Sequence, residues 1–140
     1  MQRVITLLNE KNHYLEKFYA LNESELVFMK SRNFDNLDSF YETRERILEM
    51  LRYLDSELGL SQQESEPADL SPIDKKIIVE ALRVKTEYVN RILAQDLEVL
   101  SCIEAEKNFI IRELQEVKKV KTAVSKYKMP MFDSKLDEEA

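Results

Sequence analysis

Residues that make turns are nearly absent from this sequence. It contains one glycine and three prolines in 140 residues, while 44% of its residues are hydrophobic and 34% are charged. A sheet of several strands needs a turn after each strand, and glycine and proline are the residues that most often provide it. The composition therefore predicts an all-α fold, and the length is sufficient for one domain.

The residue types that most enzymes use are also scarce. One cysteine, one histidine and no tryptophan exclude a disulfide framework and a zinc site of the usual Cys/His kind. The Glu-x-x-His motif of di-iron helical bundles is absent as well. Acidic residues such as Glu42, Glu45 and Glu49 alternate with arginines, as is typical of solvated helix faces. We therefore expect a non-enzymatic protein without a metal or other cofactor.

Long hydrophobic runs are missing too. No 18 consecutive apolar residues occur, and the first residues, MQRVITLL, are too short and too polar for a signal peptide. The chain carries 27 acidic and 21 basic side chains, for a net charge of −6, which disfavours binding to phosphate backbones. We expect a cytoplasmic protein with no membrane insertion and no nucleic-acid partner.

The few helix-breaking residues fall in two places. Gly59, Pro67 and Pro72 lie in or beside the polar stretch GLSQQESEPADLS, and Pro130 lies near the end of the chain. Polar stretches that contain glycine and proline are typical of loops. The breaks predict a single helical domain over residues 1–128. Its two arms span residues 1–58 and 72–128, and the loop between them spans residues 59–71. A flexible acidic tail follows over residues 129–140.

Capping signals flank the predicted loop. Gly59 follows Leu58, where a left-handed C-terminal cap would place a residue without Cβ. Ser71 is placed to cap the second arm, Pro72 suits the first helical position, and Asp74 favours the positive end of the helix dipole. A weaker break at residues 31–36, in which Asp35 is placed to cap, would divide the first arm into helices over roughly 2–31 and 36–58.

Apolar residues recur every three or four positions along both arms, which is the pattern of helices that pack lengthwise. Folding one arm back along the other gives an antiparallel helical hairpin or bundle. Many apolar residues of the second arm come as adjacent pairs, such as Ile92 and Leu93, so its stripe is wider than two helices need. The additional cover would be the first arm folded at Asn33, a second copy of the protein, or the helix of another protein.

The end of the chain combines soft apolar side chains with acidic ones. Pro130 is expected to end the helix, and Met129, Met131 and Phe132 then lie beside the acidic stretch DSKLDEEA. A disordered terminus is the simplest interpretation of this segment. Methionine and phenylalanine in such a segment also suit a short docking peptide.

Several short motifs of the two arms occur together in one known family. The first arm contains NFDNL at residues 33–37 and YETRERIL at 41–48. The second contains DLEVL at 96–100, EKNFI at 106–110 and KTAVSKY at 121–127. With these motifs the chain resembles the FlgN/FliT-type flagellar export chaperones, a family of cytoplasmic, mostly helical proteins of the type III export pathway.

The resemblance implies that the protein binds a flagellar hook-associated or filament-cap protein, prevents its premature assembly and delivers it to the export apparatus. In the family, client contacts concentrate on the C-terminal helical region, and a tyrosine near its end is linked to the export gate. The matching tyrosine is Tyr127. The matching client-binding positions are Leu100, Ile103, Ile110, Ile111, Leu114 and Val117. The alternative is a structural coiled-coil scaffold that forms a homodimer through the same apolar stripe.

Overall fold

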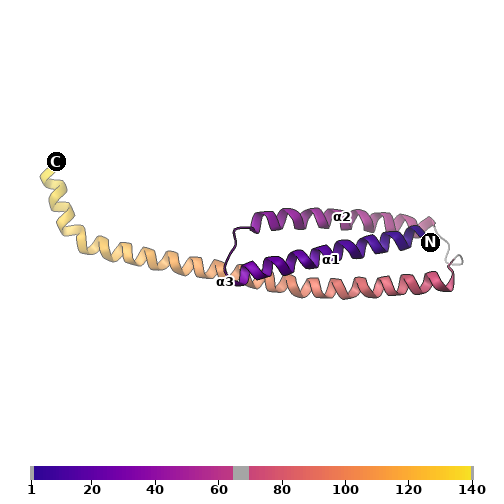
Figure 1. Ribbon diagram of the computed structural model, residues 1–140. Coiled ribbons are helices and arrows are strands. Elements are labelled where there is room, and N and C mark those ends of the chain that lie inside the picture. Colours follow the sequence, from indigo (N-terminus) through magenta and orange to yellow (C-terminus); the bar gives the residue numbers. More distant parts are fainter. Residues whose placement is uncertain (1, 65–69, 140) are drawn as a thin grey trace. The chain divides into compact units, whose positions relative to one another are not determined.

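A computed structural model describes the backbone over residues 2–64 and 70–139, and the side chains over 2–63 and 70–126. These residues form three helices and no strand: α1 (Gln2–Lys30), α2 (Leu37–Glu64) and α3 (Pro72–Glu139). The predicted all-α fold is confirmed (Figure 1). The chain divides into two units, Met1–Cys102 and Ile103–Ala140, and the boundary lies within the domain predicted over residues 1–128. We describe each unit by itself.

The predicted break at residues 31–36 is confirmed. After Lys30 the amide of Arg32 donates to the carbonyl of Met29 at 3.0 Å, and Arg32 itself has a φ of 61°. A residue in this left-handed region ends a helix because the chain can no longer continue the helical path. The Asn33 side chain then accepts a hydrogen bond from the Asp35 amide at 3.0 Å, and α2 begins at Leu37. The first arm is therefore two helices.

The cap predicted at Gly59 is wrong, because α2 continues through it to Glu64 and Gly59 does not have a positive φ. Leu58 and Ser61 lie on the same face of α2 and are both buried, so the continued helix keeps this face packed. That packing outweighs the cost of about 1 kcal/mol for a glycine inside a helix. Residues 59–64 of the predicted loop are thus helical, and residues 65–69 lie outside the described part of the chain.

The start predicted for the second arm is confirmed. The Asp74 amide donates to Ser71 Oγ at 3.1 Å, and the Lys75 amide donates to the Ser71 carbonyl at 3.0 Å. Pro72 occupies the first helical position, where its missing N–H leaves no hydrogen bond unmade. These contacts define the N-terminus of α3.

The first unit is a three-helix bundle. In one core cluster Leu8 packs with Leu54 and Ala81, and in the next cluster Phe18 packs with Ile47 and Ile92. From the first cluster to the second, residue numbers rise along α1 and α3 and fall along α2. Thus α1 and α3 run parallel, and α2 is antiparallel to both (Figure 1). The first arm, folded back at residues 31–36, packs on α3, which is one of the three covers that the sequence left open, but it covers only one face of the wide apolar stripe.

In the second unit α3 continues to Glu139, so the prediction that Pro130 ends the helix is wrong. A proline inside a helix removes one backbone hydrogen bond and costs about 3 kcal/mol, but it does not force the helix to stop. The residues around it, mainly methionine, lysine, leucine and glutamate, favour helix. The flexibility expected of residues 129–140 stays a prediction.

Candidate interaction surfaces of α3

The face of α3 that packs in the bundle follows the predicted heptad spacing. Its central side chains are almost inaccessible to solvent: Ala81 and Ile92 are each 7% exposed, and Val99 is 2% exposed. Ile78, Tyr88 and Val89 are partly buried against the same clusters. In the first unit, therefore, α1 and α2 cover this face of the helix, and it is not available to a partner.

A polar layer crosses the core of the bundle in the C-terminal half of α1. Asn22 is completely buried, and its Nδ2 donates to Gln95 Oε1 and to Asp96 Oδ1, each at 3.2 Å. Arg44 of α2 donates to Asp96 Oδ2 at 3.2 Å and lies over the ring of Phe18 at 5.3 Å. All three helices meet in this layer. Buried polar groups need hydrogen-bond partners, so they favour the one register of the packed helices in which these partners meet.

Gln95 ties the layer to a second turn of α1. Its Nε2 donates to the Tyr19 carbonyl at 3.1 Å and to Glu23 Oε1 at 2.8 Å. Next to this region Glu25 is 5% exposed, and its Oε1 has no hydrogen-bond partner among the described residues. Burial raises the pKa of Glu25 above its usual range, because a charged carboxylate loses hydration there.

The C-terminal stripe is the candidate client surface in the second unit. We use this name for its apolar side chains from Ile103 to Val124: Ile103, Ile110, Ile111, Leu114, Val117, Val120 and Val124. Ile103 is half-buried, whereas Ile110 is 47% exposed and Leu114 is 63% exposed. Every side chain from residue 110 to 126 is exposed. A contiguous apolar surface of this kind marks a site of interaction.

The charges beside the C-terminal stripe are separated along the helix. Residues 104–116 carry four acidic and two basic side chains, whereas residues 117–126 carry four lysines and no acid. Lys118, Lys119 and Lys126 line a shallow hollow on this part of α3 with Thr122. A helix that lies along the stripe would be oriented by this change of sign.

The other predicted site residues are placed as follows. Leu100 belongs to the first unit, where it is 61% exposed beside the buried Val99. The backbone of α3 includes the four positions predicted to dock with partners, but their side chains lie outside the described residues: Tyr127, Met129, Met131 and Phe132. The roles of these residues stay predictions.

A second apolar surface of α3, the outer stripe, faces away from the core of the bundle. It consists of Val79, Leu82, Thr86, Leu93, Leu97 and Leu100. Val79 is 66% exposed and Leu97 is 68% exposed. The adjacent apolar pairs were the signal for this surface in the sequence. They were interpreted as one wide stripe, whereas the structure divides three of them, Ala81/Leu82, Ile92/Leu93 and Val99/Leu100, between a buried face and an exposed one.

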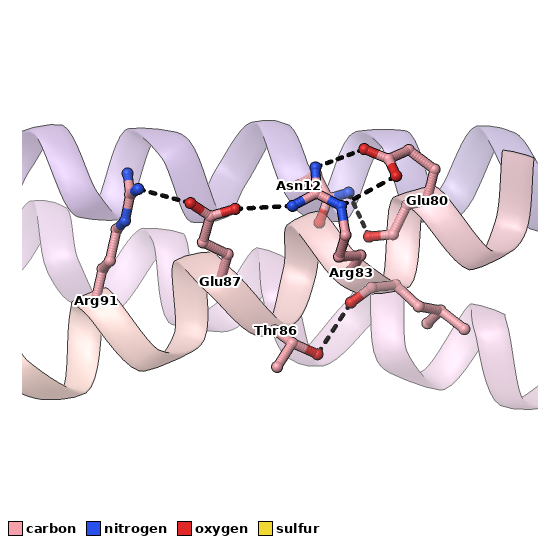
Figure 2. A network of polar contacts seen from close by, with 8 residues as sticks. Asn12, Glu80, Arg83, Thr86, Glu87 and Arg91 are labelled. Carbon is pink, nitrogen blue, oxygen red and sulfur yellow. Dashed lines mark hydrogen bonds and ion pairs between the residues drawn. The ribbon is translucent and has the colours of Figure 1, made fainter.

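A chain of ion pairs borders the outer stripe (Figure 2). Arg83 contacts Glu80 at 2.6 Å and Glu87 at 3.2 Å, and Glu87 contacts Arg91 at 2.6 Å. The hydrogen bond from Arg83 lowers the pKa of Glu80, and Glu80 in turn raises the pKa of Arg83. All four side chains are exposed, so the pairs contribute little to folding stability. They do leave this border of the stripe with no net charge.

Figure 2 also shows a hydrogen bond between α1 and α3 beside this network, and one within α3. Asn12 of α1 donates from Nδ2 to the carbonyl of Ala81 at 3.0 Å, and Thr86 donates from Oγ1 to the carbonyl of Leu82 at 3.0 Å. Asn12 therefore connects α1 to the backbone of α3. Thr86 donates its hydroxyl hydrogen within its own helix, so this donor needs no further acceptor.

Other chemistry that the residue types could provide is limited in the described part of the chain. There, no three His, Cys, Asp or Glu side chains gather closely enough to hold a metal ion. His13 is exposed and Cys102 is a half-buried free thiol. No helix within the described residues has a stretch long and apolar enough to cross a membrane.

Comparison of the chain with known protein families, with curated proteins and with solved structures found no match. The resemblance to flagellar export chaperones therefore depends on the sequence motifs given above.

Proposed function

We propose that the protein is a cytoplasmic export chaperone. It binds an amphipathic helix of a flagellar hook-associated or filament-cap protein, prevents its premature assembly and delivers it to the export apparatus. The observation that carries the proposal is the C-terminal stripe, in which Ile110, Leu114 and Val117 recur at helical spacing with half or more of the surface of Leu114 and Val117 exposed. The motif resemblance supports the choice of client.

In the proposed mechanism the C-terminal stripe covers the apolar face of the client helix, and no chemical reaction takes place. A client helix with apolar residues three and four positions apart would pack on the C-terminal stripe in the helix-in-groove mode. Each aliphatic side chain that becomes fully buried contributes about 1.5–3 kcal/mol, so a few such contacts are enough for reversible binding. While bound, the client helix cannot assemble with its own neighbours.

The first unit has a different part in this proposal. Its core residues already pack against one another, for example Phe18 and Ile92, so the bundle supplies a stable folded unit and leaves binding to the second unit. Release at the membrane would involve Tyr127, which the family resemblance links to the export gate. Met129, Met131 and Phe132 are proposed to dock on the same apparatus.

The test is a double substitution in the C-terminal stripe, Ile110→Asp with Leu114→Asp. Two carboxylates in the contact should weaken binding to a peptide spanning the terminal helix of a hook-associated protein by at least tenfold, by roughly 1.4 kcal/mol or more. Isothermal titration calorimetry measures the affinity, and circular dichroism checks the helix content.

The matched control is Val27→Asp, which introduces the same charge at a side chain of α1 that is 67% exposed. This variant should bind the peptide as the wild type does. Unchanged affinity of the double variant with intact helicity would contradict the proposal.

The scaffold alternative uses the same stripe. Ile103, Ile110, Val117 and Val124 recur every seven residues, which is the spacing of a coiled-coil seam. In that case two copies pair through the second unit and no client is released. A dimer in light scattering that the Ile110→Asp/Leu114→Asp variant abolishes, together with no binding of the peptide, would favour the scaffold.

A further inference from the structure

We infer that residues 117–132 of α3, the basic segment, bind to the surface of a membrane that contains anionic lipids. The segment carries five lysines and no acidic side chain, although the whole chain has a net charge of −6. A lipid surface is a partner that the proposed function does not include. The inference goes beyond that function, because this contact needs no client.

The lysines of the basic segment are not explained by the helix dipole. Cations are favoured in the last turn of a helix, where the carbonyl groups have no partner within the helix. Helix α3 continues to Glu139, thirteen residues beyond Lys126, and its last turn contains no basic side chain. The effect of the dipole does not extend over these additional turns. The lysines therefore gain nothing from the end of the helix.

The chain itself provides little neutralisation for these charges. Among the lysines of the segment whose side chains the structure describes, Lys119 alone has an ion pair, with Glu116 at 3.9 Å. Both side chains of this pair are more than 70% exposed, so water and salt screen it. The positive charge of the segment is thus available to an external partner.

The apolar and basic side chains lie on different sides of the helix. Val117, Val120 and Val124 are three and four positions apart, and they are 52%, 59% and 45% exposed. Lys118 and Lys126 line the shallow hollow of α3, on the side away from Val120. An exposed helix with an apolar side and a lysine-rich side is typical of segments that lie in a membrane interface.

The distribution of the lysines favours a lipid surface over a partner helix or a nucleic acid. By helical spacing Lys121 borders Val117, whereas Lys119 lies across the helix from it. A partner helix touches one strip of α3. The field of an anionic surface extends about 8–10 Å at physiological salt, close to the helix diameter of about 10 Å, so it acts on all the lysines. Nucleic acid would use the lysines but not the exposed valines.

Acidic neighbours limit the contact to the basic segment. Residues 104–116 carry four acidic side chains before it, and residues 133–139 carry four after it. An anionic surface repels both neighbours and attracts the segment between them. Each lysine near such a surface strengthens binding about fivefold, so the contact should be reversible and sensitive to salt.

Co-sedimentation of the full chain with vesicles tests the contact. With phosphatidylcholine vesicles that contain about 30% phosphatidylserine, binding at about 0.05 M salt should be at least tenfold tighter than with phosphatidylcholine alone. Raising the salt to about 0.5 M should reverse this binding, because the salt screens the lysines. No binding to the anionic vesicles, or equal binding to both kinds, would overturn the inference.

Lys118→Gln with Lys121→Gln tests the basic segment. At about fivefold for each lysine, the variant should bind the anionic vesicles at least tenfold more weakly. The matched control is Lys75→Gln with Lys76→Gln, which removes the same charge at exposed positions of α3 in the first unit and should retain most of the binding. An equal loss in the control would mean that binding follows the net charge of the chain, and would overturn the inference.

A fluorescent residue tests whether the valine side meets the lipid. The chain has no tryptophan, so a single introduced one reports on its own surroundings. The emission of Val120→Trp should shift to shorter wavelength with anionic vesicles, because this side enters the headgroup region. Asn108→Trp, at an exposed position before the segment, should show no shift. An absent shift at Val120, or a DNA duplex that binds as tightly as the vesicles, would overturn the assignment to lipid.

The inference and the proposed function fail separately. Vesicle binding is measured without a client, and the Lys118→Gln/Lys121→Gln variant should still bind the client peptide. Ile110→Ala with Leu114→Ala, which changes no charge, should weaken binding of the peptide and leave vesicle binding unchanged. Vesicle binding that is lost in this variant but kept in the lysine variant would refute the inference.

Discussion

Helix α3 has the same apolar repeat in both units, but the side chains of the repeat are buried in the first unit and exposed in the second. In the bundle, Ile92 is 7% exposed and Val99 is 2% exposed, whereas in the second unit Ile110 is 47% exposed and Val117 is 52% exposed. The pairs match in residue type and in their seven-residue spacing. The repeat therefore determines which residues share a face, and only the packing of other helices determines whether that face is buried.

The largest expected effect is on the free energy of unfolding, when alanine replaces a leucine of the bundle rather than a leucine of the second unit. Leu54→Ala removes a side chain that is 1% exposed, and the resulting cavity should lower the free energy of unfolding by about 2–5 kcal/mol. Leu114→Ala, at a side chain that is 63% exposed, should change it by less than about 0.5 kcal/mol. Urea denaturation followed by circular dichroism measures both. Equal losses would mean that the second unit is packed in solution.

The next comparison uses two asparagines. Asn22→Ala removes the donor to the buried Gln95 Oε1 and one of the two donors to Asp96, so it should cost about 1–3 kcal/mol of unfolding free energy. Asn108→Ala, at an exposed position of the second unit, should leave the midpoint of the same urea titration unchanged. A neutral Asn22→Ala would show that the polar layer does not stabilise the bundle.

The smallest expected effect concerns two glutamates and depends on pH. Because burial raises the pKa of Glu25 in the folded state, the native chain binds this proton more tightly than the unfolded chain does. This group therefore makes stability fall as the pH rises from the ordinary glutamate range through the raised pKa. Glu25→Gln should increase the free energy of unfolding at neutral pH by up to about 1 kcal/mol, since it removes a buried charge.

That gain should shrink as the pH is lowered below the raised pKa of Glu25. Glu113→Gln, an exposed substitution in the second unit, provides the baseline. Thermal unfolding at a series of pH values measures both variants. A gain at Glu25 that is the same at every pH would contradict the assignment of its cause to burial of the charge.

Much of the fold follows from local signals in the sequence. The break at residues 31–36 and the cap at Ser71 were predictable because side-chain hydrogen bonds over two or three residues determine them. Pro130 was misleading because the helix-favouring residues around it outweigh its cost. Gly59 was misleading for a different reason. At Gly59 the burial of Leu58 and Ser61 keeps the helix going, and burial is a tertiary effect that a single residue type does not reveal.

The surfaces were predictable only in part. The family resemblance pointed to Leu100 and to most positions of the C-terminal stripe, but neither it nor the spacing of apolar residues revealed the outer stripe. Adjacent apolar residues such as Ile92 and Leu93 are consistent with one wide surface or with two opposite ones. The choice depends on where α1 and α2 lie around α3, and their positions depend on the fold of the first arm.

The buried amide of Asn22 affects how much of α3 is covered by the bundle and how much stays exposed. Sliding α1 by one heptad, about 10 Å, would leave this buried amide without its partners, because Gln95 and Asp96 occur at one level of the helix. The polar layer thus fixes the position of α1 along α3. It decides how many turns of α3 the bundle occupies, and so how many after Cys102 are left to meet other molecules.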